Sequence, residues 1–348
     1  MNQLTVGVIF GGQSSEYSIS LHSTASLLRE INREKYNVVM IGISQSGGFY
    51  LYEGSIDDME HDHWVEQGVK CAWVPGGILP LDGRQQISLD CAFPVLHGKN
   101  GEDGSIQGLL ELMNIHYVGC DVLSSAISMD KEMMHILCKE GGVPCADYVC
   151  LKENQDNPTF EEIKDQIPLP WIVKPCSAGS SYGVHKVENK EEFENAINDA
   201  WHYDGRGKCL VEKAIDGFEI GCAVMGNKII QTGSCDEIEI TRGFFDFEGK
   251  YALDGAQIHC PARIDKEVFE QAQELAKKTY RVMNCLGMAR VDMFVQKDNS
   301  IVLNELNTIP GFTATSRYPS MMKEVGLEFS ELIDRLIELA MERELGVC

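Results

Sequence analysis

The sequence has 348 residues, of which 44% are hydrophobic and 24% are charged, and its net charge is −23. This length is enough for two or three packed units, and the charge argues against a nucleic-acid partner and against a basic contact with a membrane surface. Phosphate ligands stay open, because a few local cations, backbone N–H groups and magnesium can hold them.

The sequence shows no pattern for export or for crossing a membrane. Its first residues lack a basic segment followed by an apolar one, and no run approaches 18 apolar residues. The 13 cysteines are scattered, with no CxxC pair and no zinc-ligand spacing. We therefore expect a cytoplasmic protein with reduced thiols, many of them small core residues.

Strands alternate with helices in a first predicted domain, residues 1–125. Such alternation predicts an α/β domain with a parallel sheet and right-handed crossovers, in which ligands gather at the carboxyl ends of the strands. The loops GGQSSE and HGKNGEDG would lie at that edge, and the acidic stretch 55–64 is predicted to be a solvated loop. The predicted elements are strands at 4–12, 36–44 and 89–98 and helices at 18–31 and 105–115.

Two further units are predicted. Residues 126–215 combine valine-rich strands with glycine turns, which favours a small α+β layer, and residues 216–348 form the third unit and end in an amphipathic helix. Within the third unit, the segment from about Asp236 to Ile258 has three glycines and little periodicity, which is typical of a closing loop.

The segment KPCSAGSSYGV begins with Lys174 at a predicted strand end and continues as a loop rich in glycine and serine. Its N–H groups and hydroxyls are suited to phosphates, and the lysine adds a compact charge, although the loop is no Walker A motif. About forty residues later, the strand that contains Glu212 and Lys213 runs on to Glu219. Its backbone is suited to an adenine and Glu219 to ribose hydroxyls, although a solvated strand end explains either segment by itself.

A group of oxygen ligands is predicted at the end of the chain's last strands. Arg290 and Asp292 share one face of the strand MARVDMFV, because residues two apart on a strand point the same way. Glu305 and Asn307 share a face of the next strand, after a hairpin-like turn. Two carboxylates and an amide suit magnesium on nucleotide phosphates, and Arg290 could stabilise a transferring phosphoryl group.

Together these motifs resemble those of the ATP-grasp D-alanine–D-alanine ligases, in order and spacing and over essentially the whole chain. The motifs that carry the resemblance are GGQSSEYSISL, HGKNGEDGSIQG, VKPCSAGSSYG, EKAIDGFEIG, MARVDMF and NELNTIPGFTATSRYP. The resemblance implies an ATP-grasp fold behind an N-terminal parallel-sheet domain. It also implies the reaction: ATP phosphorylates the carboxylate of one D-alanine, the amine of a second D-amino acid attacks the acyl phosphate, and phosphate leaves, so that a peptidoglycan precursor is made.

The resemblance implies a role for each matching residue. Glu16 would bind the ammonium group of the first D-alanine and would be linked to Ser180 and Tyr251, while His97 would line the cleft. Arg290 and the Gly311 amide would stabilise the tetrahedral intermediate, and Ser316 would hold the carboxylate of the second substrate. The implied ATP-binding residues are Lys131, Lys174, Glu212, Lys213, Ile215, Glu219 and, on a mobile lid, Lys250. The implied ligands of two Mg²⁺ (or Mn²⁺) ions are Asp292, Glu305 and Asn307.

Two positions bear on the second substrate. Arg317 in SRYP stands where many housekeeping ligases have an aliphatic residue or Met, and this resembles the vancomycin-resistance ligases that use D-serine or D-lactate. Ligases that make the D-lactate ester usually have His in place of Tyr251, so D-alanine and D-serine stay open. Cys176 replaces a residue that is commonly Ser or Ala, and a thiol of similar size should change little.

Other functions must be weighed against this one. Another ATP-grasp carboxylate–amine ligase would share the metal and phosphate residues but would not be expected to have Glu16, Ser180 and Tyr251. A nucleotide-binding regulatory protein on the same fold would not need Arg290 as a charge clamp. The family is usually dimeric through its first domain, and we expect a homodimer here.

Overall fold

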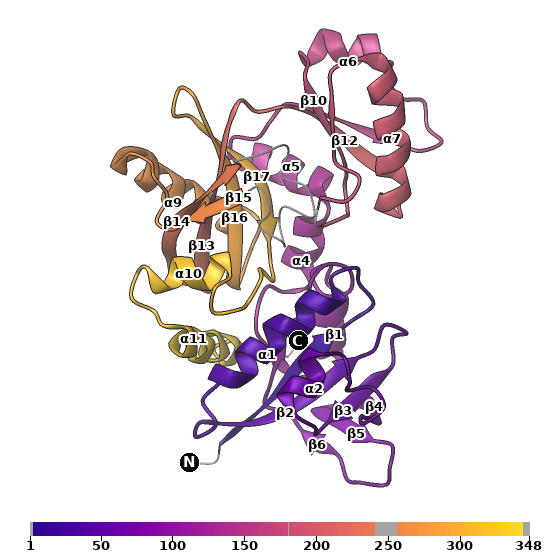
Figure 1. Ribbon diagram of the computed structural model, residues 1–348, viewed down its shortest axis with the longest axis vertical. Coiled ribbons are helices and arrows are strands. Elements are labelled where there is room, and N and C mark those ends of the chain that lie inside the picture. The colour runs from indigo at the N-terminus through magenta and orange to yellow at the C-terminus, as the bar shows by residue number, and fades with distance from the viewer. Residues whose placement is uncertain (1–2, 180, 241–255, 344–348) are drawn as a thin grey trace.

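The computed structural model describes residues 3–179, 181–240 and 256–343. The chain forms three sheets, one in each of the three predicted units, although the boundaries near residues 125 and 215 stay predictions. In Figure 1 the first sheet lies in the lower half of the molecule, and the second and third sheets lie side by side in the upper half. Among the described residues, no helix is long and apolar enough to cross a membrane.

The first sheet has eight strands in the order β6-β5-β4-β3-β2-β1-β7-β8. Strands β2, β1, β7 and β8 are parallel, as predicted, but β3 to β6 pair antiparallel with their neighbours, which the alternation of strands and helices did not predict. The strands are β1 (Leu4–Gly11), β2 (Tyr36–Ile43), β3 (Phe49–Tyr52), β4 (Val69–Val74), β5 (Gly77–Pro80), β6 (Ile87–Ser88), β7 (Cys91–Pro94) and β8 (His116–Tyr117).

The helices around this sheet include α2, which corrects the predicted loop at 55–64. Ser55 caps α2 by accepting a hydrogen bond from the Asp58 amide, and both Met59 and Trp64 are fully buried, so this acidic stretch covers the core. Because Met59 and Trp64 are isolated among polar residues, the sequence pattern does not show that their side chains are buried. The helices are α1 (Tyr17–Glu30), α2 (Ile56–Glu60), α3 (Ser105–Leu112) and α4 (Val122–Met129).

The second sheet has the order β11-β10-β12-β9 and is antiparallel throughout, with α7 packed on it. Helix α5 begins at the Asp130 cap, whose side chain accepts the amides of Glu132 and Met133. The elements are α5 (Lys131–Glu140), β9 (Tyr148–Lys152), α6 (Phe160–Gln166), β10 (Trp171–Pro175), β11 (His185–Val187), α7 (Lys190–Asp204) and β12 (Lys208–Lys213).

The third sheet has the order β15-β14-β13-β16-β17 and is also antiparallel. The ends of the predicted closing loop are strand residues, since Ile240 in β14 pairs with Ala256 in β15; residues 241–255 between them lie outside the described residues. The elements are β13 (Gly217–Gly226), β14 (Ile230–Ile240), β15 (Ala256–His259), α9 (Lys266–Val282), β16 (Gly287–Gln296), β17 (Ile301–Asn307), α10 (Arg317–Lys323) and α11 (Phe329–Met341).

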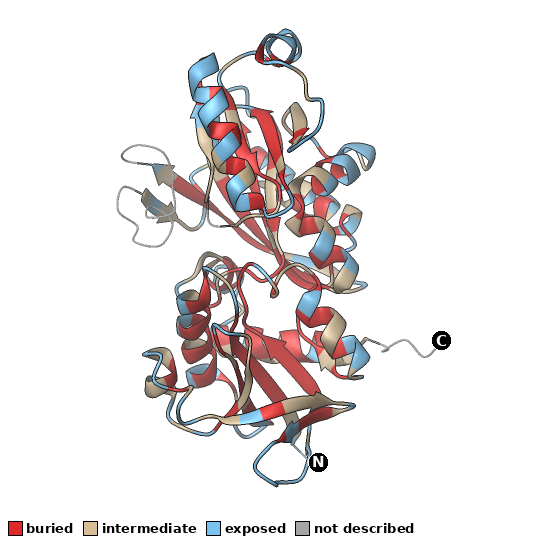
Figure 2. Ribbon diagram, turned by 90° about the vertical axis from the view of Figure 1, so that its right-hand side faces the viewer, coloured by how far each residue is buried: buried red, intermediate tan, exposed pale blue. Residues whose placement is uncertain are grey.

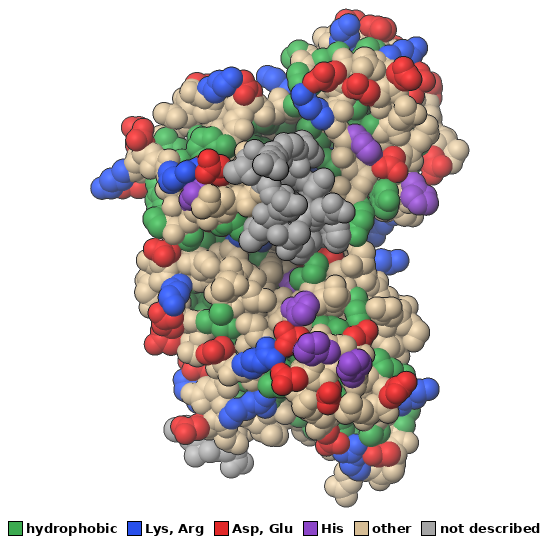
Figure 3. Space-filling model, in the orientation of Figure 1, with side chains coloured by type: hydrophobic (Ala, Val, Ile, Leu, Met, Phe, Trp, Pro, Cys, Tyr) green, Lys and Arg blue, Asp and Glu red, His purple; other side chains and the backbone are tan. Residues whose placement is uncertain are grey.

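The last helix, α11, joins the first and third units. Its buried face includes Leu332 and Leu336, which belong to the same hydrophobic cluster as Val6 and Phe10 of β1. Figure 2 shows the buried residues concentrated in the sheets and along the inner faces of the helices. On the face shown in Figure 3, Lys and Arg side chains are interspersed with Asp and Glu, so no extended basic surface is seen there.

Candidate active site

Two loops at the carboxyl ends of β1 and β7 form the N-terminal wall of the site. Because these strands are parallel neighbours, the loops that follow them meet at one edge of the sheet, as predicted. Glu16 is buried there, immediately before α1. Gly98 has a φ of +72°, and a Cβ at this position would overlap the Glu16 carboxylate. Glycine at this position is therefore required both by the backbone conformation and by the space that Glu16 occupies.

The predicted phosphate loop lies between β10 and β11, and Lys174 is buried near its start. The Lys174 Nζ lies 2.7 Å from Glu212 on the neighbouring strand β12, and the other Glu212 oxygen lies 2.7 Å from Nε2 of the buried His135. Burial raises the pKa of Glu212, but the attraction of Lys174 and the contact with His135 outweigh it and lower this pKa to about 2. Glu212 is therefore ionised and holds Lys174 at the loop.

The predicted metal ligands come together on β16 and β17. Asp292 lies directly opposite Glu305 in the antiparallel register, and Arg290 lies opposite Asn307, with a bulge after Asp292. Side chains in such positions have Cβ atoms about 5 Å apart, so the two carboxylates repel each other unless a cation balances them. The Asn307 Nδ2 donates to Asp292 at 2.9 Å, which turns the Asn307 amide oxygen away from Asp292.

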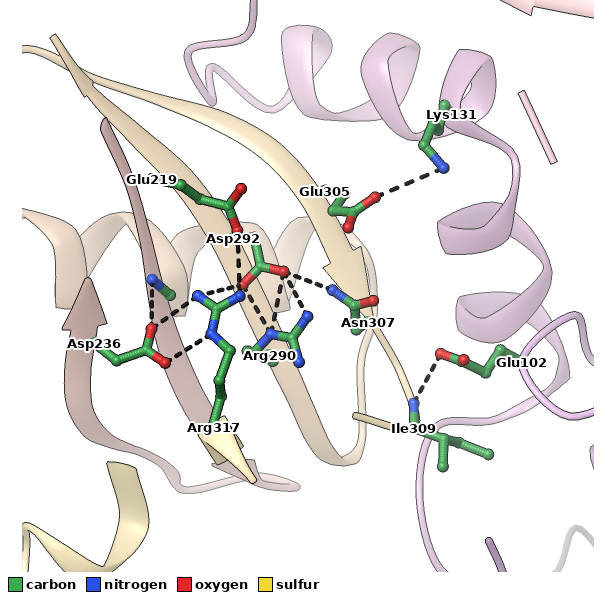
Figure 4. A network of polar contacts seen from close by, with 11 residues as sticks. Glu102, Lys131, Glu219, Asp236, Arg290, Asp292, Glu305, Asn307, Ile309 and Arg317 are labelled. Carbon is green, nitrogen blue, oxygen red and sulfur yellow. Dashed lines mark hydrogen bonds and ion pairs between the residues drawn. The ribbon is translucent and has the colours of Figure 1, made fainter. Parts of the chain in front are cut away.

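Cations balance both carboxylates in this structure (Figure 4). Arg290 binds Asp292 through two nitrogens, at 2.8 Å from Nε and 2.7 Å from Nη2. The Lys131 Nζ lies 3.7 Å from Glu305 and donates to the Ala178 carbonyl at 3.0 Å. Burial lowers the pKa of Arg290, but Asp292 outweighs burial and raises it, so Arg290 stays charged. A donor set of two carboxylates and an amide oxygen fits Mg²⁺, which prefers hard oxygen ligands.

Arg317, at the start of α10, reaches into the same network. Its Nε and Nη2 donate to the two oxygens of Asp236 at 2.7 and 2.8 Å, and its Nη1 donates to Glu219 at 3.2 Å. Nη2 also lies 3.4 Å from Asp292. Gly221 makes room for this contact, because a Cβ there would overlap Arg317 and lie 2.6 Å from Asp236. Arg317 therefore connects the residue predicted to bind ribose with a predicted metal ligand.

Cavities connect these groups. A cavity of about 620 Å³ is lined by residues of the second and third units, and a smaller one of about 100 Å³ adjoins it. The smaller cavity contains Glu16, Arg290 and Asn307 in its wall, and a third cavity of about 880 Å³ continues from Glu16 toward the surface. The first two cavities share Lys131, Ala178, Gly179 and Glu305. The predicted ATP-binding residues in the wall of the 620 Å³ cavity are Lys131, Lys174, Glu212, Lys213, Ile215 and Glu219.

The remaining predicted residues lie after β17, in the N-terminal domain, or outside the described residues. Gly311 approaches Ser316 closely, since a Cβ on Gly311 would lie 3.3 Å from the Ser316 Oγ, which accepts the Thr313 amide at 3.0 Å. His97 is buried, and its ring nitrogens contact the Ile309 carbonyl and the Ser23 hydroxyl, so this prediction of a substrate contact gains no support from the geometry. Three predicted residues, Ser180, Lys250 and Tyr251, lie outside the described residues.

The sequence motifs did not predict two acidic residues of the site. Asp236 is fully buried beside Arg317, and Glu102 lies in the wall of the 100 Å³ cavity. Burial and the nearby Glu16 raise the pKa of Glu102 to about 7, against the opposing effect of two backbone N–H donors and Arg290. Glu102 stands in the motif HGKNGEDG, and its place in that motif is the one signal in the sequence that points to it.

Comparisons with known proteins identify relatives of the whole chain. The family model described as "D-ala D-ala ligase N-terminus" matches residues 5–120, and "D-ala D-ala ligase C-terminus" matches residues 137–338. The chain is 43% identical to "Vancomycin C-type resistance protein VanC1" of Enterococcus gallinarum, over 97% of this chain and 98% of that protein. It is 41% identical to a D-alanine–D-alanine ligase of Caldicellulosiruptor bescii, over 99% of this chain and 96% of the relative.

A solved structure is similar over nearly the whole chain. It is the VanG D-Ala:D-Ser ligase from Enterococcus faecalis, with a TM-score of 0.91 and 42% identity, and the match covers 97% of this chain and 100% of that chain. The fold, with its three sheets, is therefore the ATP-grasp fold, as the motifs predicted, and the sheet of its N-terminal domain is mixed rather than wholly parallel.

Proposed function

This chain belongs to the D-alanine–D-alanine ligase family and is an ATP-dependent carboxylate–amine ligase, and we propose that it joins D-alanine to D-serine in preference to a second D-alanine. The proposal rests on one observation, the ion pair of Arg317 with Asp236 next to Ser316. The likeness to a D-Ala:D-Ser ligase supports it.

The reasoning concerns the hydroxyl of serine. Arg317 follows Ser316, which we propose holds the carboxylate of the second substrate, so the Arg317–Asp236 pair is close to where the side chain of that substrate would lie. Among the described residues, Asp236 and Glu219 take three of the five N–H donors of the guanidinium. The guanidinium therefore keeps N–H groups that a hydroxyl can accept, whereas Asp236 is fully buried with both oxygens bonded to Arg317. An aliphatic residue at position 317 would offer a hydroxyl no such donor.

Phosphorylation makes the first carboxylate reactive, because it converts an oxygen that cannot leave into a phosphate that can. We propose that Glu16 orients the ammonium group of the first D-alanine in the 100 Å³ cavity, and that Lys131 and Lys174 hold the phosphates of ATP in the 620 Å³ cavity. Since the two cavities share Lys131 and Glu305, the γ-phosphate and the carboxylate would meet there. Arg290 and the Gly311 amide would stabilise negative charge on the tetrahedral intermediate.

Two Mg²⁺ ions would be held by Asp292, Glu305 and Asn307, and when bound they would neutralise charge on the phosphates. In the structure, Asp292 pairs with Arg290 and Glu305 pairs with Lys131. When ATP and the metal bind, the two carboxylates would turn to the metal and the two cations would turn to the phosphate groups. Lys250 on the predicted lid, with Ser180 and Tyr251, would complete the site.

The experiment measures phosphate release from ATP with D-alanine alone and with D-alanine plus D-serine, and identifies the dipeptides by chromatography. We expect D-alanyl-D-serine as the main product when both amino acids are present at equal concentration. A product that is mainly D-alanyl-D-alanine would refute the preference and leave the ligase activity in place.

We also propose that the protein is a homodimer in the cytoplasm. The described cysteines are all free thiols, which supports a reducing compartment. Light scattering tests the dimer.

A further inference from the structure

A segment of the C-terminal unit, residues 309–316, is attached to the N-terminal domain through its backbone. Glu102 Oε2 accepts the Ile309 N–H at 3.1 Å, and the His97 Nδ1 contacts the Ile309 carbonyl at 3.0 Å. Two serines of α1 extend this contact, because the Ala314 N–H donates to Ser26 at 3.1 Å and the Phe312 N–H donates to Ser23 at 3.5 Å. The segment that carries Gly311 and Ser316 is thus positioned by side chains of another unit.

Glu102 has a special place among these contacts because it uses both of its oxygens. While Oε2 accepts the Ile309 N–H, Oε1 accepts the Gly98 N–H at 3.0 Å. Gly98 in turn lies directly against the Glu16 carboxylate. One carboxylate therefore links the wall that holds Glu16 to the segment that leads to Gly311.

We propose that Glu102 is a positioning residue, which sets the distance between the first-substrate wall at Glu16 and the second-substrate segment 309–316. This inference rests on the proposed function. The acyl phosphate and the incoming amine must meet in one geometry, and a displacement of about 1 Å costs up to about 10²-fold in rate. Without Glu102, His97, the α1 serines and the packing of Phe312 on Phe93 would still hold the segment, but no other side chain among the described contacts accepts both the Gly98 N–H and the Ile309 N–H.

The test compares Glu102→Gln and Glu102→Ala with the wild type. In Glu102→Gln an amide N–H faces one of the two backbone N–H groups, so one hydrogen bond is lost and two donors oppose each other. Glu102→Ala removes both acceptors without adding a donor. We expect kcat/KM for the second D-amino acid to fall about 10- to 100-fold in both variants, with a higher KM for that substrate. The KM for ATP should stay within about two-fold, since Lys174 and Glu212 are untouched.

The control is Glu111→Gln, which removes an acid of the same domain whose oxygen accepts the Tyr117 hydroxyl, away from the cavities. It should leave every constant within about two-fold. A merely structural role for Glu102 would lower the unfolding midpoint and the active fraction, and would reduce kcat with all KM values unchanged. That result, or wild-type constants in Glu102→Gln and Glu102→Ala, would overturn the inference. A wild-type chain that forms no dipeptide would instead refute the proposed function.

Discussion

The substitutions Asp292→Asn and Glu305→Gln separate the metal site from the stability of the fold. Each removes one negative charge from the proposed metal-ligand set, so each should reduce ligation by about 10²–10³-fold even at saturating magnesium. The ion pairs of the structure predict that the two substitutions differ in their effect on the stability of the fold. Asp292 is 1% exposed and binds Arg290, whereas the Glu305 side chain is 24% exposed and lies 3.7 Å from Lys131.

The magnitudes follow from these environments. Removal of one partner from a buried ion pair costs about 3–5 kcal/mol, because the other charge stays buried. A partly exposed pair with a long contact contributes about 0–1 kcal/mol. Since each kcal/mol lowers the unfolding midpoint by about 2–4 °C in a chain of this order of size, Asp292→Asn should lower it by roughly 6 °C or more. Glu305→Gln should change it by about 4 °C at most.

The assays are phosphate release at saturating ATP, magnesium and amino acids, and thermal unfolding without ligands. Asp298→Asn is the matched control, because Asp298 is an exposed acid on the same β16–β17 hairpin and bonds only to the neighbouring Ser300 among the described contacts. Full turnover by Glu305→Gln would refute the metal assignment. Equal unfolding midpoints for wild type and Asp292→Asn would refute the reasoning about the buried pair.

Two more predictions concern Arg317 and Glu212. In Arg317→Met, the ratio of kcat/KM for D-serine to that for D-alanine should fall about tenfold, because one matched hydrogen bond of roughly 1.4 kcal/mol is lost; an unchanged ratio would show that Arg317 only organises Asp236. Glu212 has a lowered pKa of about 2, so it stabilises the fold above its unfolded value of 4.5, and this contribution is lost as pH falls from there toward 2. The difference in unfolding free energy between wild type and Glu212→Gln should therefore shrink between about pH 5 and about pH 3, and a constant difference would contradict the assignment.

Local patterns predicted the parts of the site that neighbouring residues build. The period of two on a strand was enough to place Asp292 beside Arg290 and Glu305 beside Asn307, and the short turn between the strands placed the two pairs opposite each other. Lys174 was also predicted, but its ion-pair partner was not. The motif assigned Glu212 to the adenine end of ATP, whereas the structure shows Glu212 paired with Lys174. Pairing across strands β10 and β12 is not visible in either strand alone.

The parts that were missed depend on contacts between distant segments. Asp236 was placed within a closing loop, yet it is fully buried in β14, where Arg317, 81 residues away, compensates its charge. Glu102 contacts Ile309, 207 residues away, and no periodicity relates the two. A buried acid has the same local pattern as an exposed one until its partner is known, so the sequence alone could not assign either residue.

These contacts also bear on how the proposed ATP site would hold a triphosphate in a chain with a net charge of −23. Four cations in and beside the proposed site are mostly buried, and each is paired with an acid in the described structure. The pairs are Lys131 with Glu305, Lys174 with Glu212, Arg290 with Asp292, and Arg317 with Asp236. Phosphate groups alone would have to compete with these carboxylates for the cations. With magnesium present, Asp292 and Glu305 would hold the metal and would leave Arg290 and Lys131 to the phosphates. The affinity for ATP should therefore rise with magnesium more steeply than in a site whose lysines have no acidic partner.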